Sequence, residues 1–170
     1  MRLYLLRHAE AIPRGTAGVS QDAARPLTEE GRRQARQVAK GLQRLGVPVE
    51  VIAASPYVRA AQTAEEVARV LEPEEPVRTL EALRAEAKPR ETSAALAALA
   101  SHGHVVLVGH EPHLGAWLAE LVAGEDGLRC VFKKGGVACV EVERVPPPRG
   151  SGTLRWLMTP TQLGLIGTTP

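Results

Sequence analysis

The chain has 170 residues, of which 44% are hydrophobic and 24% charged, and its formal net charge is +2. These figures suit one folded domain with a substantial core and exclude a disordered chain. The low charge and an aromatic content of 3% argue against a nucleic-acid partner, because nucleic acids attract strongly basic surfaces and stack on aromatic rings. No apolar run approaches the roughly 18 residues of a membrane span, and the first ten residues lack a signal peptide's apolar stretch. We therefore expect a cytoplasmic protein with no membrane partner.

Strands and helices are predicted to alternate through the first 120 residues. Short apolar runs predict strands at residues 2–6, 49–53, 77–80 and 104–108. Capping residues, prolines and helical periodicity predict helices over residues 28–45, 55–71, 89–103 and 112–122. In this prediction Ser55 is the N-cap of the second helix and Pro56 its first residue. Residues 9–27 lack periodicity, and a loop this long in a compact domain is usually functional.

The C-terminal part follows a different pattern. Residues 137–145 alternate with period two, and a Pro/Gly-rich turn then leads to residues 153–158, which predicts an antiparallel pair of strands. The expected fold is therefore a three-layer α/β domain over residues 1–170. It has a largely parallel central sheet, helices on both faces and an antiparallel edge near the C-terminus.

Two cysteines, Cys130 and Cys139, are expected to be reduced, buried thiols, because no export signal is apparent. A disulfide is the alternative if residues 128–133 and 137–144 form a hairpin around residues 133–136, since the two thiols would then face each other. Lys133 and Lys134 at the tip of that hairpin are interpreted as a charged turn rather than a binding patch.

Candidate functional residues follow three of the predicted strands. Arg7 and His8 follow the first strand, His110 follows the fourth, and Arg59 lies early in the helix after the second. In open α/β sheets the carboxyl ends of the strands line the ligand crevice, so these side chains are expected to meet. Two fixed cations, two imidazoles and a helix N-terminus suit a compact anion such as phosphate, and no acidic residue stands out to neutralise them. Neighbouring cations disfavour protonated imidazole, which leaves a neutral ring nitrogen able to attack phosphorus.

A metal site is the weaker interpretation of the same region. His113 lies one helical turn after His110, and Glu111 lies between them. However, the spacing differs from that of the two-histidine zinc helix, and Pro112 interrupts the start of the helix. We therefore expect no metal and no other cofactor.

At these residues the sequence resembles the histidine phosphatase superfamily. The matching segments, in chain order, are Leu6–Glu10, Pro26–Gly31, Ser55–Ala64 and Gly109–Pro112. Within the superfamily the chain is most similar to the small SixA-type phosphohistidine phosphatases, in a resemblance that includes residues 22–28 and 156–160. The resemblance implies a phosphoglycerate-mutase-like fold.

The resemblance also implies residue roles. His8 would be the nucleophile that becomes phosphorylated, while the phosphoryl group would be bound by Arg7, Arg59 and His110. Arg25 would approach the same site from the long loop. There are two departures from the superfamily pattern: Ala9 replaces a glycine, and the acid of larger members has no clear match, although Glu81 or Glu86 could serve.

The predicted activity is that of a metal-independent phosphatase acting on phosphohistidine in a partner protein. Phosphohistidine has a labile P–N bond, so its hydrolysis needs less help from an acid than that of an alkyl phosphate ester. Two alternatives remain open: a phosphatase of small phosphate esters with the same mechanism, and a non-catalytic phosphate-binding module. With the sheet and helices assigned, 170 residues are expected to leave no room for a lid or cap domain, and the segment 81–89 is too short to cover the site. An open site favours a protein substrate.

Overall fold

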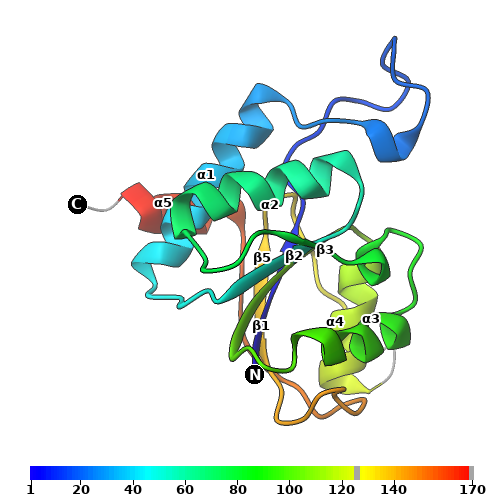
Figure 1. Ribbon diagram of the computed structural model, residues 1–170, viewed down its shortest axis with the longest axis vertical. Helices are drawn as coiled ribbons and strands as arrows, with labels where there is room; N and C mark the ends of the chain where they lie inside the picture. The colour runs from blue at the N-terminus through cyan, green and yellow to red at the C-terminus, as the bar shows by residue number, and fades with distance from the viewer. Residues whose placement is uncertain (125–126, 169–170) are drawn as a thin grey trace.

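The computed structural model describes residues 1–124 and 127–168, and its centre is a six-stranded sheet of order β3-β2-β4-β1-β5-β6 (Figure 1). The strands are β1 (Arg2–Arg7), β2 (Val51–Ala54), β3 (Arg78–Thr79), β4 (His104–Gly109), β5 (Val137–Glu141) and β6 (Thr153–Met158). Strands β3, β2, β4 and β1 run parallel, whereas β5 pairs antiparallel with β1 and β6 pairs antiparallel with β5. The parallel sheet and its antiparallel C-terminal edge are thus confirmed.

Five α-helices cover the two faces of this sheet. They are α1 (Glu29–Arg44), α2 (Val58–Leu71), α3 (Pro89–Ala95), α4 (His113–Ala123) and α5 (Pro160–Thr168). Short 3-10 helices occur at η1 (Asp22–Ala24), η2 (Glu81–Leu83) and η3 (Leu96–Leu99). Helices α1, α2 and α5 lie on one face and α3 and α4 on the other, so the three-layer arrangement is confirmed (Figure 1). None of the helices in the described residues is long and apolar enough to cross a membrane.

Alternation along β1 divides the core into two clusters. Leu3 and Leu5 are fully buried with Trp117 of α4 on one face of the sheet, whereas Leu6 packs with Val38 of α1 on the other. Because successive side chains of a strand point to opposite faces, a central strand with helices on both sides must be apolar throughout. This explains why β1 and β4 are continuous apolar runs.

The start of α1 holds the chain that follows His8. Thr28 is the N-cap, as predicted, and its hydroxyl accepts a hydrogen bond from the Gly31 N–H at 2.9 Å. A Cβ atom on Gly31 would lie 1.9 Å from the carbonyl oxygen of Glu10, which only glycine avoids. The Thr28 N–H donates to the same carbonyl at 3.0 Å. These contacts fix the position of residues 8–10 against the helix.

The free thiols expected of Cys130 and Cys139 are confirmed, and the hairpin of the disulfide alternative is absent. Residues 128–133 form no strand, because β5 pairs with β1 and β6 instead. The two cysteines are therefore free: Cys130 packs against the cluster beside α4, and Cys139 lies in the cluster on the opposite face of the sheet. Helix α5 was not predicted, because its sequence lacks a polar face, and α3 ends at Ala95, where η3 follows.

Candidate active site

The carboxyl ends of three adjacent parallel strands bring the candidate residues together. Strand β4 lies between β1 and β2, and its last residues hold the chains that leave both neighbours. The His8 N–H donates to the Gly109 carbonyl at 3.0 Å, and the Ser55 N–H donates to the Val108 carbonyl at 2.9 Å. The ring centroids of His8 and His110 are consequently 5.1 Å apart.

The His8 imidazole is held in one tautomer by two hydrogen bonds. Its Nδ1 lies 2.7 Å from the Ala9 carbonyl oxygen, which can only accept, so Nδ1 carries the proton. Its Nε2 accepts a hydrogen bond from Arg59 Nε at 3.1 Å and therefore has the lone pair. Burial, followed by the charges of Arg59, Arg7 and Arg25, lowers the pKa of His8 to about 4. His8 is therefore a neutral imidazole at neutral pH.

Arg59 is the second residue of α2 and is only 3% exposed. Besides its bond to His8, it donates from Nη1 to the Asp22 carbonyl at 2.7 Å and from Nη2 to Asp22 Oδ2 at 2.9 Å. A guanidinium has five N–H groups, so one N–H on each Nη nitrogen has no partner among the described residues. Two donors of Arg59 are thus available to a phosphoryl oxygen.

Asp22 corrects the prediction that no acidic residue neutralises the cations. Its carboxylate in η1 forms ion pairs with Arg59, Arg25 and Arg14. Although burial opposes it, the hydrogen bond from Arg25 and the charges of Arg59 and Arg25 lower the pKa of Asp22 to about 2. Arg25 also donates to the Ile12 carbonyl at 2.7 Å. Arg25 therefore lies near the site but is held by Asp22.

Ser55 has a different role from the predicted one. Helix α2 begins at Val58 with Tyr57 as its N-cap, so Ser55 does not cap it. Its hydroxyl instead lies 2.8 Å from Nε2 of His110, and both side chains are almost completely buried. Burial, followed by the neighbouring His8 and Arg59, lowers the pKa of His110 to about 2. Its Nδ1 is buried without a partner among the described residues and is the nitrogen left for a ligand.

Tyr57 borders the two histidines and connects them to the segment after β3. Its ring centroid lies 4.8 Å from that of His110 and 5.0 Å from Cζ of Arg59. Its hydroxyl donates to Glu86 Oε2 at 2.8 Å. Glu81, the other candidate acid, is exposed and forms an ion pair with Arg84. Of the two carboxylates, Glu86 is therefore the one connected to the site.

Arg7 is fixed by the turn that precedes β5. Its Nη1 donates to the Phe132 carbonyl at 2.6 Å, and its backbone N–H donates to the Gly136 carbonyl at 3.0 Å. Its Nε is buried without a partner among the described residues, and burial lowers the pKa of the guanidinium. Arg7 therefore has donors that no protein acceptor uses.

The residues of the metal interpretation do not form a cluster. Nε2 of His113 lies 2.8 Å from the hydroxyl of Thr92 on α3, a contact that accounts for this buried histidine. Over residues 1–124 and 127–168, no group of three or more His, Cys, Asp or Glu side chains is placed to hold a metal ion.

Sequence reasoning missed Asp22, Ser55 and Tyr57 as members of the site. Asp22 and Ser55 both stand within segments that carry the family resemblance, so a signal was present. Ser55 was interpreted as a helix cap because Ser-Pro is a common helix start. Nothing in the sequence shows that the loop of residues 9–27 returns to Arg59, because that contact depends on tertiary structure.

This fold, with paired histidines and arginines at the strand ends, defines a class of phosphatase. The profile of the histidine phosphatase superfamily (branch 1) matches residues 3–88. The chain belongs to the histidine phosphatase superfamily, and with that membership it is a phosphatase, a hydrolase. An uncharacterised protein from Picosynechococcus sp. is 38% identical over 81% of this chain and 82% of its own length.

Similar proteins include phosphohistidine phosphatase SixA from Escherichia coli, which is 32% identical over 96% of both chains. A solved structure of the protein histidine phosphatase SixA complexed with tungstate has a TM-score of 0.81 and 32% identity, covering 96% of this chain and 99% of its own. The alpha-ribazole phosphatase from Shigella flexneri has a TM-score of 0.73 at 19% identity, covering 94% of this chain and 97% of its own. The last match shows a shared fold only.

Proposed function

We propose that the protein hydrolyses phosphohistidine in a partner protein through a phosphorylated intermediate on His8. The observation that carries the proposal is the state of the His8 ring. The Ala9 carbonyl holds the proton on Nδ1, burial keeps the imidazole neutral, and the Nε2 lone pair lies beside Arg59. A neutral ring nitrogen in a cationic site is an activated nucleophile for phosphorus.

The reaction has two displacements. In the first, the Nε2 lone pair of His8 forms a bond to phosphorus while the P–N bond of the substrate breaks, and the leaving imidazole takes up a proton. In the second, water attacks phosphorus, the bond to His8 breaks and phosphate leaves. Arg7, Arg59 and Nδ1 of His110 donate to the phosphoryl oxygens, whose charge these groups stabilise during both steps.

Two features support phosphohistidine as the substrate. The relatives named above include phosphohistidine phosphatases that match nearly the whole length of this chain. In addition, the described residues place no carboxylate in direct contact with the His8 or His110 ring, and an imidazole leaving group needs little acid help.

Small phosphate esters are the second candidate substrate class, and the Tyr57–Glu86 contact favours them. An alkoxide leaving group needs a proton, and Glu86 lies one hydrogen bond beyond Tyr57, whose ring packs against His110. Both substrate classes therefore remain candidates, and the test compares the turnover of the two directly.

The test measures turnover of a phosphohistidyl peptide and of p-nitrophenyl phosphate in the presence of EDTA. We expect kcat/KM to favour the phosphohistidyl peptide, activity to survive EDTA, and His8→Ala to lose at least about 1,000-fold in kcat. Acid-labile phosphate should be trapped on the wild-type protein during turnover. His113→Ala is the control, because it also removes a buried histidine but leaves both His8 and His110 in place.

Three outcomes would contradict parts of this proposal. Full activity in His8→Ala would exclude the covalent mechanism. Preference for the ester over the phosphohistidyl peptide would assign the protein to small phosphate esters. Binding of phosphate without turnover of either substrate would indicate a phosphate-binding module.

A further inference from the structure

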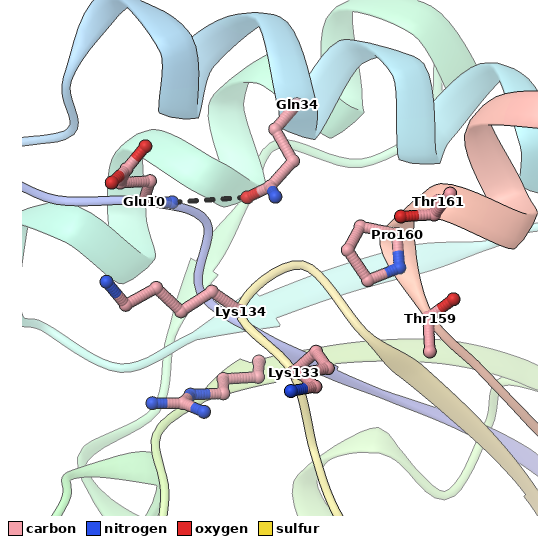
Figure 2. A pocket seen from close by; sticks show the side chains of 8 residues that line it. Glu10, Gln34, Lys133, Lys134, Thr159, Pro160 and Thr161 are labelled. Carbon is pink, nitrogen blue, oxygen red and sulfur yellow. Dashed lines mark hydrogen bonds between the residues drawn. The ribbon is translucent and has the colours of Figure 1, made fainter.

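The lysine pair of the turn before β5 lines a pocket that borders the candidate active site at Arg7. This pocket has a volume of about 550 Å³ and is lined by Arg7, Glu10, Gln34, Lys133, Lys134, Thr159, Pro160 and Thr161. Figure 2 shows Glu10 and Lys134 on one side and Pro160 and Thr161 on the other. The walls of the pocket thus come from the end of β1 and the segment after it, helix α1, residues 133–136 (the lysine turn) and the start of α5.

The lysine turn is rigidly attached to the candidate active site. The Gly135 N–H donates to the carbonyls of Arg7 at 3.0 Å and His8 at 3.2 Å, and the Gly136 N–H closes the turn on the Lys133 carbonyl at 2.8 Å. Gly135 has a φ of +75°, which side chains other than glycine rarely adopt, and a Cβ there would lie 3.1 Å from Gln34. The two lysines are therefore presented at a fixed place beside His8.

The pocket is rich in hydrogen-bond donors that lack acceptors. Lys133 and Lys134 are exposed, and neither ammonium group pairs with a carboxylate in the described residues. The amide oxygen of Gln34 accepts from the Glu10 N–H at 3.2 Å, which leaves the amide NH₂ of Gln34 to face the pocket (Figure 2). Three cationic side chains line the pocket against one carboxylate. Such a lining is complementary to an anion.

We propose that this pocket binds a carboxylate side chain of the phosphorylated partner protein, next to its phosphohistidine. The proposal rests on the proposed function and deepens it by naming a recognition site. His8 and Glu10 are two residues apart, so the Cα atom of the nucleophile lies within about 7 Å of the Cα atom of a pocket-lining residue. An acidic residue within about four positions of the phosphohistidine can span that distance. The pocket would then select partners with acidic flanks.

The test compares two phosphohistidyl peptides that differ only in their flanks, one with Glu and the other with Gln within four positions of the phosphohistidine. We expect the wild-type protein to favour the Glu peptide by about fivefold to tenfold in kcat/KM, through KM, with a preference that falls as salt rises. Lys133→Gln/Lys134→Gln should abolish the preference and leave turnover of the Gln peptide and of p-nitrophenyl phosphate unchanged. The matched control is Lys40→Gln/Arg44→Gln, which removes two exposed cations of α1.

Two results would overturn the proposal. Equal losses on both peptides and on p-nitrophenyl phosphate would show that the lysines act on the phosphoryl group, and an unchanged preference would show that the pocket binds no carboxylate.

Binding of the unphosphorylated Glu peptide separates this proposal from the proposed function. Chemical shifts of the Gly135 amide and the Gln34 side-chain amide should move in the wild-type protein and not in the double lysine variant. Shift changes without turnover of phosphohistidine would overturn the proposed function alone. If the shifts do not move, only the proposal that the pocket binds a carboxylate is overturned.

Discussion

The candidate active site and the pocket lined by Lys133 and Lys134 (the lysine pocket) are neighbours at opposite halves of one sheet. The first lies where the parallel strands β1, β4 and β2 end, and its side chains are buried: His8 is 6% exposed and His110 is 1% exposed. The second lies beside the antiparallel strands, where exposed lysines project from a turn. Buried groups have fixed partners and shifted pKa values, whereas exposed cations are solvated and flexible. We infer that the first region sets the chemistry and the second sets partner preference.

The largest expected loss of activity comes from a substitution in the buried active site. Arg59→Lys retains the charge but removes the planar group that donates to His8 Nε2 and to the backbone carbonyl and Oδ2 of Asp22. We expect kcat to fall by about 100-fold to 1,000-fold on every substrate, because a lysine cannot reproduce this geometry. Steady-state kinetics on both peptides and the ester measure the loss.

Arg69→Lys is the matched control, since Arg69 lies on the same helix and forms an ion pair with Glu66. It should leave all three rates unchanged. A loss in Arg59→Lys confined to the Glu peptide would contradict the division of labour between the two regions.

A smaller loss is expected when the support of His110 is removed. In Ser55→Ala, His110 loses the hydroxyl 2.8 Å from Nε2, the hydrogen bond that orients its ring. We expect kcat to fall about tenfold, which corresponds to one buried hydrogen bond, with KM nearly unchanged. The ¹⁵N shifts of His110 should change at the same time. A tenfold loss with unaltered His110 shifts would argue for a general packing defect instead.

Strand periodicity and motif spacing predicted the parallel sheet and the four residues Arg7, His8, Arg59 and His110, because strand ends in such sheets converge. Contacts made by the long loop and by turns were not predictable in the same way. Asp22 reaches Arg59 over 37 positions of sequence. The lysine turn was interpreted as a charged turn rather than a binding patch, since its attachment to His8 consists of backbone hydrogen bonds, which no pattern of side chains reveals.

In the lysine pocket, Glu10→Gln is expected to raise activity on the Glu peptide rather than lower it. This substitution removes the single carboxylate among the lining residues, so an acidic flank meets less repulsion. We expect kcat/KM for the Glu peptide to rise by about twofold to threefold, while the rates on the Gln peptide and p-nitrophenyl phosphate stay constant. Glu65→Gln removes an exposed carboxylate of α2 and should change none of them. An equal rise on all three substrates would place Glu10 in the phosphoryl chemistry.

The smallest expected change concerns the charge of the nucleophile between pH 7 and pH 5. Burial lowers the pKa of His8 to about 4, so the imidazole should stay at least about 90% neutral at pH 5, whereas an imidazole with the ordinary pKa of 6.5 would be about 3% neutral there. The His8 Cε1–H chemical shift, followed by NMR in the absence of substrate, should be nearly constant over this range. A midpoint near 6.5 would contradict a buried, neutral nucleophile.

The same shifts fix the direction in which stability depends on pH. The pKa values of His8, His110 and His113 are lowered to about 4, 2 and 4, mainly by burial. Between pH 6.5 and pH 4 the unfolded chain therefore binds protons that the native state does not, so the free energy of unfolding must fall as the pH falls. Thermal denaturation should give a lower Tm at pH 5 than at pH 7.

His113→Phe, which removes one of these buried imidazoles and leaves His8 and His110 in place, should reduce that difference in Tm, because one proton fewer is taken up on unfolding. Lys133→Gln/Lys134→Gln should leave the difference unchanged, since these exposed side chains do not contact the three buried histidines.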